Sequence, residues 1–263
     1  MDNGHRVGST EVLVVVPTLG TRPDWLQECV TSIGSQEGVS PRIRIVCPSG
    51  TVTLKEFSVN RVEIIEYDKR GLAAAIREGF ANYDGEFITW LGDDDKLQPG
   101  SLQAVVEALK SSPQASFAYG RTRYIAASGS TIGVTRPGRL AAHYLTVGKD
   151  FVPQPGSVIR RSAYEAVGGI DVDLANAMDL DLFIRLQRYG ASVYVPRELS
   201  CYRLHESSIT VTKGDKDEGE LVRLRYLSKT LRSSYRVWRP VTRILDRVWD
   251  VSNRRLPSPS APR

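Results

Sequence analysis

Three consecutive carboxylates, Asp93, Asp94 and Asp95, are the residues whose type and spacing most suggest chemistry. Like charges at this spacing repel one another, so the triplet is either a solvated turn or a place where a bound cation relieves the repulsion. Mg²⁺ and Mn²⁺ prefer oxygen ligands, and Mg²⁺ is commonly held by one or two carboxylates together with phosphates. The triplet alone leaves both interpretations open.

The segments around the triplet alternate between strand and helix patterns. We expect strands at 12–16, 42–47, 62–67 and 86–91, and helices at 22–35, 71–80 and 99–109. Short runs rich in β-branched residues indicate the strands, and apolar residues three and four positions apart indicate the helices. This alternation predicts a mostly parallel, doubly wound α/β sheet, which binds ligands beyond the carboxyl ends of its strands. Thr18, Pro48 and Asp93 each follow a strand and should gather at that edge.

The second half of the chain has a more mixed, α+β pattern. We expect paired strands within 115–125, a turn at 126–131, helices at 139–147 and 178–189, and short strands at 157–159, 192–195 and 199–203. The sequence thus predicts an N-terminal extension at 1–10, a folded domain at 11–215, a helical tail at 216–255 and a disordered Pro/Ser-rich end at 256–263.

Composition excludes several classes of protein. The 263 residues suffice for one large domain with an appendage, and no apolar stretch approaches the ~20 residues that span a bilayer. The N-terminus lacks the apolar segment of a signal peptide. The cysteines, Cys29, Cys47 and Cys201, are scattered, so neither a disulfide framework nor a zinc site is expected. We therefore expect a cytoplasmic protein.

The net charge of +5 is concentrated at the C-terminal end. Residues 221–263 carry eleven Lys or Arg and two Asp, which leaves the rest of the chain slightly acidic. Apolar residues recur at helical spacing on both sides of Pro240, which predicts two amphipathic helices with Arg-rich polar faces. Such helices either pack on the domain or a second subunit, or lie on an anionic membrane at the inner face of the cell membrane, and both remain open. No aromatic-basic motif for specific nucleic-acid binding is present.

Six segments resemble, in chain order, the family 2 glycosyltransferases with the GT-A fold. They are VVVPTLGTRPDWL, KRGLAAAIREGF, GEFITWLGDDDKLQPGSL, PGSVIRRSAYEAVGGID, AMDLDLFIRL and YRLHESSIT, and they extend from about Glu11 to Thr210. The resemblance implies an inverting, hexosyltransferase-type enzyme of cell-surface polysaccharide biosynthesis. It implies a nucleotide-diphosphate sugar as donor, Mn²⁺ or Mg²⁺ as cofactor, and a glycan or lipid-linked glycan as acceptor. It assigns the nucleotide to residues 11–98 and the acceptor to residues 99–215.

The same resemblance implies roles for residues of the first half that match the family's motifs. Thr18 corresponds to the position where the first strand meets the nucleotide, and Arg70 to a basic residue that contacts the donor. Asp93 corresponds to the acid nearer the ribose, Asp94 to the metal ligand and Asp95 to the adjoining acid. Each also has an ordinary alternative, since Thr18 could be a helix-entry residue and Arg70 a surface charge.

In the second half, Asp179 corresponds to the family's catalytic base and His205 to a histidine that approaches the metal or the diphosphate. A base on the acceptor hydroxyl and a metal on the departing diphosphate would allow one displacement, which inverts the anomeric carbon. Asp179 could instead only favour a helix N-terminus, and His205 could only be packed. Asp181 is the weaker candidate for the base because it lies on another face of the helix.

Two departures from the family pattern bear on donor binding. The family's motif often reads Leu-Asp-x-Asp-Asp, and alignment on Leu91 puts Gly92 at its first acid, so either Asp94 or Asp95 could be the metal ligand. The loop after the second strand reads VCPSGTV, without the acid that the family usually carries there. A non-catalytic nucleotide-sugar-binding protein and a nucleotidyltransferase remain alternatives, although PTLGTRP is poor in the glycines that the latter would need.

Acceptor specificity should depend on the segment 148–157, whose geometry the sequence does not give. Within it, Gln154 either points into the acceptor site or belongs to an ordinary loop. Just beyond it, we expect Arg160 and Arg161 to form a solvated helix start.

Overall fold

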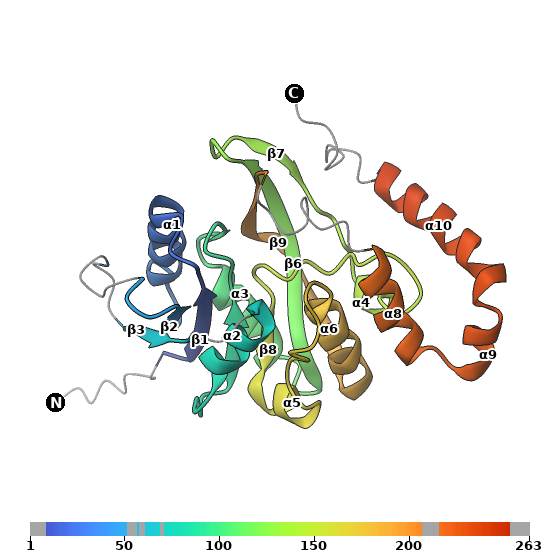
Figure 1. Cartoon of the computed structure of the whole chain (residues 1–263), viewed down its shortest axis with the longest axis horizontal. Helices are drawn as coiled ribbons and strands as arrows, with labels where there is room; N and C mark the ends of the chain where they lie inside the picture. The colour runs from blue at the N-terminus through green and yellow to red at the C-terminus, as the bar shows by residue number, and fades with distance from the viewer. Residues whose placement is uncertain (1–8, 52–56, 58–60, 69–70, 207–215, 253–263) are drawn as a thin grey trace.

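The computed structural model describes residues 9–51, 57, 61–68, 71–206 and 216–252. Among these residues, nine strands form one mixed sheet in the order β3-β2-β1-β4-β8-β6-β9-β5, with β7 paired to β6. Helices lie on both sides of this sheet (Figure 1). The predicted α/β architecture, parallel in its first half and mixed in its second, is confirmed.

The first half consists of β1 (Glu11–Pro17), α1 (Pro23–Gly34), β2 (Ser40–Cys47), β3 (Val62–Glu66), α2 (Leu72–Phe80) and β4 (Phe87–Trp90). β1 pairs in parallel with both β2 and β4, and β2 pairs in parallel with β3. The carboxyl ends of these four strands therefore meet at one edge. The strands and helices predicted for this half are confirmed, with bounds that differ by one or two residues.

The second half consists of β5 (Lys96–Leu97), α3 (Ser101–Lys110), β6 (Ala115–Ala126), β7 (Thr131–Val134), α4 (Ala141–Tyr144), β8 (Val158–Arg160), α5 (Arg161–Ala166), α6 (Met178–Tyr189) and β9 (Ala191–Leu204). β8 is antiparallel to β4 and β6, and β5 is antiparallel to β9, whereas β6 and β9 are parallel. The β5–β9 pairing brings the residues after β9 beside the residues before β5.

Three predictions for this half were wrong. The segment 115–125 belongs to one strand, β6, because its partners β8 and β9 come from far along the chain. The segments 192–195 and 199–203 belong to one strand, β9, which continues through Pro196 with a shift of register against β6. Such an irregularity accommodates proline, which has no N–H for the sheet. The helix expected at 139–147 is only the short α4.

The alternation of side chains along β1 divides the core between the two faces of the sheet. Val12, Val14 and Val16 pack with α1 and α3, whereas Leu13 and Val15 pack with α2 and α6. Successive side chains of a strand point to opposite faces, and all five are fully buried. A strand covered on both faces therefore explains the continuous apolar run, and each buried side chain contributes roughly 1.5–3 kcal/mol.

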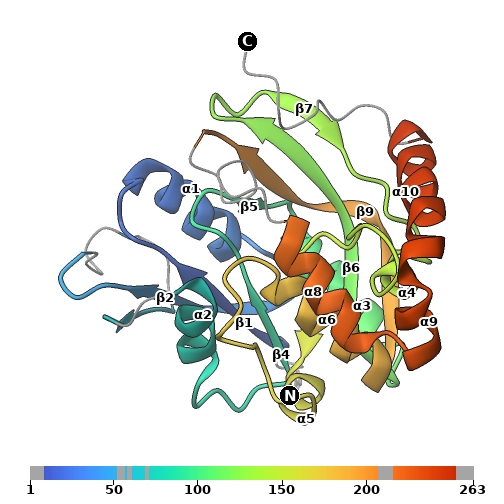
Figure 2. The same cartoon turned by 45° about the vertical axis from the view of Figure 1, so that its right-hand side comes forward.

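Helices α8 (Lys216–Tyr226), α9 (Lys229–Ser233) and α10 (Tyr235–Ser252) follow β9 within the described residues. α8 packs on α6 with Val222 fully buried, and α10 lies along the outer side of the molecule, far from β3 (Figure 1, Figure 2). Pro240 lies inside α10, so the expected separation into two helices at that residue was wrong. The helix continues although proline lacks an N–H for one backbone hydrogen bond.

The division of the chain predicted from sequence stays a prediction. Its N-terminal extension and its disordered end fall mostly on residues 1–8 and 253–263, which lie outside the described residues. The packing of α8 on α6 bears on the predicted tail, because a helix assigned to the tail shares the core of the domain. Within the described residues, the structure contains no helix with the length and apolar character needed to cross a membrane.

Candidate active site

The carboxyl edge of β1 and β4 holds the first group of predicted site residues. Because these strands are parallel neighbours, Thr18 and the loop after Trp90 emerge side by side. The Thr18 hydroxyl donates a hydrogen bond to Oδ2 of Asp93 at 2.5 Å and accepts one from the N–H of Gly20 at 2.9 Å. Thr18 and Asp93 are both buried, so these bonds take the place of water.

Arg22, for which the sequence indicated only a helix start, lies at the centre of this edge. Its guanidinium contacts Oδ1 of Asp93 at 2.8 Å and Oδ2 of Asp94 at 3.1 Å. The same group lies 2.9 Å from Nε2 of His205. A cation placed between neighbouring carboxylates offsets their repulsion, so the chain's own arginine relieves part of the electrostatic cost of the triplet. The available signal was a basic residue four positions after Thr18 at the end of a strand.

His205 reaches the acidic triplet from the far end of the chain. In the β5–β9 pair, Lys96 lies opposite Cys201, which places the residues after β9 beside the triplet. Nε2 of His205 lies 2.7 Å from Oδ2 of Asp94, and the His205 ring lies 4.9 Å from the ring of Trp25. The two residues predicted as metal ligands, Asp94 and His205, therefore meet in space.

Asp95 is enclosed by the protein. It is 3% exposed, and its Oδ1 accepts a hydrogen bond from the N–H of Arg203 at 2.9 Å. Burial and the nearby charge of Asp94 raise the pKa of Asp95 well above its usual range. The guanidinium of Arg203 in turn donates to the backbone oxygen of Asp94 at 3.0 Å and to that of Ala127 at 3.1 Å. Asp95 and Arg203 thus fix the shape of the loop that presents Asp94.

The first two acids of the triplet differ in their surroundings. Burial raises the pKa of Asp93, although the Thr18 hydroxyl and the Arg22 guanidinium act in the opposite direction. The side chain of Asp94 is 17% exposed, compared with 5% for that of Asp93. Asp94 is therefore the acid of this pair that a ligand could reach more easily.

The capacity of this edge for a metal rests on Asp94 and His205. Within the described part of the chain, no cluster of three or more His, Cys, Asp or Glu side chains is arranged to hold a metal. A carboxylate oxygen and an imidazole nitrogen nevertheless suit Mn²⁺, and one or two protein ligands suffice for Mg²⁺ when phosphates and water complete its shell. These two residues thus fit a site that is completed by a diphosphate.

Asp179 lies in the first turn of α6 and belongs to a second group of polar residues. Its Oδ1 accepts a hydrogen bond from the N–H of Leu180 at 2.8 Å, and burial raises its pKa. Glu218 of α8 accepts hydrogen bonds from the N–H groups of residues 175–177, just before this helix. Because Glu218 already supplies the negative charge that a helix N-terminus favours, helix stabilisation is a weaker explanation for Asp179.

Asp150, which the sequence did not single out, lies within electrostatic range of Asp179. Its Oδ1 accepts a hydrogen bond from the N–H of Val152 at 2.9 Å. Burial and the charge of Asp179 raise the pKa of Asp150 to about 7. The available signal was that Asp150 is the single acid of the segment 148–157, which was expected to shape the acceptor pocket.

Tyr124 of β6 lies within electrostatic range of one carboxylate of each group, Asp95 and Asp150. Burial and the charges of Asp95 and Asp150 raise the pKa of its phenol to about 12. Its ring packs against that of Tyr202 with a centroid separation of 5.3 Å. Because one side chain lies within electrostatic reach of both Asp95 and Asp150, the triplet and the Asp150–Asp179 pair border the same region of the molecule.

Asp181 and Gln154 make hydrogen bonds to other parts of the protein. The Asp181 carboxylate accepts hydrogen bonds from Arg185 at 2.8 and 2.5 Å and from the Tyr226 hydroxyl at 2.6 Å, and thereby joins α6 to α8. Gln154 donates to the backbone oxygen of Trp90 at 2.8 Å, at the carboxyl end of β4. Both side chains therefore have hydrogen-bond partners within the protein.

Arg160 and Arg161 donate hydrogen bonds to backbone oxygens of neighbouring elements. Arg160 was expected to be solvated, but it donates to the backbone oxygens of Ala115 and Leu109. Arg161 likewise donates to the backbone oxygens of residues 84 and 85, so the expected solvation was wrong for both side chains. The expected helix start is confirmed, because α5 begins at Arg161. Arg70 lies outside the described residues, and its contact with the donor stays a prediction.

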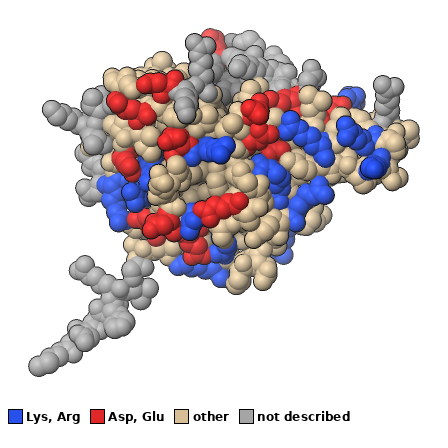
Figure 3. Space-filling view, turned by 60° about the horizontal axis from the view of Figure 1, so that its bottom comes forward, with Lys and Arg blue, Asp and Glu red and all other residues tan. Residues whose placement is uncertain are grey.

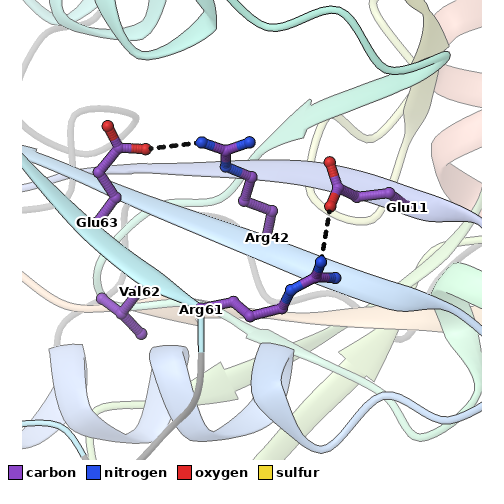
Figure 4. Close-up of a pocket in the computed structure, with 5 residues that line it drawn as sticks. All are labelled: Glu11, Arg42, Arg61, Val62 and Glu63. Carbon is purple, nitrogen blue, oxygen red and sulfur yellow. Dashed lines mark hydrogen bonds and ion pairs between the residues drawn. The ribbon is translucent and has the colours of Figure 1, made fainter.

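A shallow pocket with a volume of about 370 Å³ lies away from this edge, at the start of β1 and β3 (Figure 4). Two ion pairs line it, Arg61–Glu11 at 3.3 Å and Arg42–Glu63 at 3.4 Å. Sheets of this kind bind their ligands at the carboxyl ends of the strands. Since the pocket lies at the opposite ends and its charges are paired, we assign it no part in the site.

Comparison with known proteins identifies relatives. The sequence matches glycosyl transferase family 2 over residues 13–168, which is more than half of the chain. The O-antigen biosynthesis protein RfbC of Myxococcus xanthus is 24% identical in an alignment of 200 residues, which covers 69% of this chain and 15% of that protein. The chain thus spans a small part of the length of this relative.

Solved structures of S. aureus TarS have the same fold. The complex of TarS 1–349 with UDP-GlcNAc has a TM-score of 0.65 at 10% identity and covers 90% of this chain and 73% of that one. A second structure of TarS 1–349 has a TM-score of 0.59 at 12% identity and covers 94% of this chain and 89% of that one. These likenesses confirm a GT-A-like fold. The match over residues 13–168 shows that this chain belongs to glycosyl transferase family 2.

Proposed function

We propose that this protein is a metal-dependent, inverting, hexosyltransferase-type enzyme. It moves a sugar from a nucleotide-diphosphate sugar to a hydroxyl of a glycan or lipid-linked glycan. The observation that carries the proposal is the convergence of Asp94, His205 and Arg22, whose polar atoms lie 2.7 to 3.1 Å apart. Carboxylate, imidazole and guanidinium groups at one point suit a cation and a diphosphate together.

At the donor end, Asp94 and His205 would hold Mn²⁺ or Mg²⁺. A bound cation of this kind stabilises the negative charge of a departing diphosphate. Arg22 contacts both ligands and is placed to bind a phosphate oxygen through its guanidinium. Thr18 and Asp93 lie at the end of β1 and β4, where the nucleoside would lie, with Asp93 nearer the ribose. A UDP-sugar is the first donor to test, because TarS has been solved with UDP-GlcNAc.

At the acceptor end, Asp179 would take the proton of the attacking hydroxyl. A buried carboxyl with a raised pKa is a stronger base than a solvated one, which suits proton abstraction near neutral pH. Asp150 lies within electrostatic range of Asp179 and has a pKa of about 7, so the pair carries less than two charges at neutral pH. A single displacement by this hydroxyl inverts the anomeric carbon. The similarity to RfbC supports a polysaccharide acceptor.

The full chain and a panel of UDP-, GDP- and dTDP-sugars would test this proposal. Binding should raise the melting temperature of the protein only when Mn²⁺ or Mg²⁺ is present. Release or transfer of the sugar should then stop in a chelator, and the product should have the inverted anomeric configuration. Undiminished turnover in the chelator would contradict the role of the metal. Donor binding without release or transfer would favour the non-catalytic alternative.

A further inference from the structure

α10 turns its polar side to the protein. The backbone oxygen of Thr242 accepts a hydrogen bond from the Tyr144 hydroxyl at 3.3 Å, and Thr242 is buried. Asp246 accepts a hydrogen bond from the N–H of Lys149 at 2.9 Å and pairs with Arg239 at 3.3 Å. Residues three and four positions apart share one side of a helix, so Arg239, Thr242 and Asp246 form a single docked side.

The opposite side of α10 is apolar and exposed. It consists of four side chains with exposed fractions of 79, 56, 59 and 49%, namely Val237, Val241, Ile244 and Leu245. Their spacing of four, seven and eight positions from the first residue places them on one face, which we call the outer face of α10. An amphipathic helix usually buries its apolar side in its own protein. A contiguous exposed apolar face therefore marks an interaction site.

The exposed charges that accompany the outer face are positive. Among the described side chains of residues 229–247, the exposed ionisable ones are Lys229, Arg232, Arg243 and Arg247. Asp246, the single acidic residue of this segment, is turned to Lys149 and Arg239 instead. Figure 3 shows Lys and Arg side chains among uncharged residues on the right-hand lobe, where α9 lies. Cations beside an apolar stripe complement anionic headgroups above a hydrocarbon layer.

We propose that the outer face of α10 binds the surface of an anionic phospholipid membrane, with the helix lying in the plane of the headgroups. The apolar side chains enter the boundary between headgroups and acyl chains, and Arg243 and Arg247 contact the phosphates. A second copy of the chain is a less suitable occupant, because pairing two such faces would bring their cations together.

If α10 lies on a membrane, the position of the acceptor site follows, and this step rests on the proposed function. Lys149 contacts α10 through its N–H and is the neighbour of Asp150 in the chain. A membrane-bound α10 would therefore hold the Asp150–Asp179 region close to the bilayer, where a lipid-linked acceptor would be within reach. Membrane binding itself does not depend on sugar transfer and can be tested without it.

Cosedimentation of the full chain with vesicles tests the proposal. Vesicles of phosphatidylcholine mixed with phosphatidylglycerol should bind the protein, whereas vesicles of phosphatidylcholine alone should bind it weakly. Added salt should weaken the binding, because it screens the attraction between the arginines and the lipid. Equal binding to both kinds of vesicle at all salt concentrations would overturn the role of charge.

Two pairs of variants separate the apolar and the charged contributions. Val241→Asn with Ile244→Asn should lower the partition coefficient at least about tenfold, because two apolar side chains no longer enter the lipid. The matched control, Val172→Asn with Tyr189→Asn, changes exposed apolar residues elsewhere and should bind like the wild type. Arg243→Gln with Arg247→Gln should lower the partition coefficient about 25-fold, or about fivefold for each arginine, whereas Arg77→Gln with Lys110→Gln should leave it unchanged.

Loss of binding in the two control variants to the same extent would contradict a specific outer face. Light scattering on the same proteins would show whether the outer face of α10 instead binds a second copy of the chain. A wild-type dimer that Val241→Asn and Ile244→Asn convert to a monomer, with no vesicle binding in either form, would make the face a subunit interface and overturn the proposal. Donor binding should be the same in all these variants, so a failure here leaves the proposed transferase function standing.

Discussion

Nε2 of His205 lies 2.7 Å from Oδ2 of Asp94, although the two residues are 111 positions apart in the sequence. Arg22 contacts both from the start of α1. Three distant parts of the chain converge here because β1, β4 and the β5–β9 pair bring their ends to one edge of the sheet. This convergence is the structural basis of the predictions on donor binding.

Asp94→Ala and His205→Ala should each weaken Mn²⁺-dependent donor binding by at least about tenfold, because each removes one of two protein ligands of the cation. Isothermal titration with a UDP-sugar, with and without Mn²⁺, would measure the change. His143→Ala is a matched control, since His143 is exposed and lies apart from this edge. An unchanged Mn²⁺ dependence in both variants would exclude this pair as the metal site.

Asp179→Asn should leave donor binding intact and lower the rate of transfer by about 10²–10⁴, the range expected for loss of a general base. Asp181→Asn, two residues along, should behave differently. It leaves Arg185 without its charged partner and should lower the free energy of unfolding by about 3 kcal/mol. Transfer kinetics and chemical denaturation of both variants would separate the two roles, and retained transfer in Asp179→Asn would rule it out as the base.

The rate of transfer should depend on two carboxyl ionisations. It should fall as the pH falls through the raised pKa of Asp179, because a protonated carboxyl cannot take the acceptor proton. A second change near pH 7 should come from Asp150. In Asp150→Asn the change near pH 7 should disappear, while the change that comes from Asp179 remains. A pH profile of kcat/KM for both proteins would show this, and an identical profile would exclude Asp150 from the site.

Asp150 should also make stability depend on pH. In the folded protein its carboxyl keeps its proton up to about pH 7, whereas the ordinary value of 3.8 applies once the chain unfolds. Between these values the folded state binds more protons, so the free energy of unfolding should fall as the pH rises. At pH values above 7, Asp150→Asn should therefore have a higher Tm than the wild type. At pH values below 3.8, the two proteins should have the same Tm. Calorimetry would contradict this if the Tm difference did not vary with pH.

Gly92→Asp should weaken metal-dependent donor binding rather than improve it, even though the family often has an acid at the aligned position. A Cβ atom at Gly92 would lie 2.7 Å from Oδ1 of Asp94 and 3.2 Å from Oδ2 of Asp95. The side chain of Asp94 would have to turn, and a fourth carboxylate would add repulsion. Titration with Mn²⁺ and a UDP-sugar would measure the loss. Gly92→Ala should show a smaller loss of affinity. Full affinity in both variants would mean that the Asp94 side chain can turn away without loss of binding.

Much of the nucleotide-binding half could be predicted from the sequence, because its signals are local. The run Val12–Val16 marks a strand buried on both faces, and the spacing of apolar residues marks α1, α2 and α3. The same local signals place the acidic triplet after β4 and Asp179 at the start of α6. The resemblance to family 2, which depends on such segments in order, is confirmed by the match over residues 13–168.

The sequence by itself thus determined the elements, their apolar faces and the types of side chain at the carboxyl edge, because each follows from residues close together in the chain. Only the tertiary structure decided that His205 and Arg22 meet Asp94, that Asp95 is enclosed by Arg203, and that Asp150 lies near Asp179. The spacing in α10 likewise showed an apolar face but not its outward direction. Such arrangements depend on strand pairing and helix packing between distant segments, and one segment alone carries no record of the partner against which it will pack.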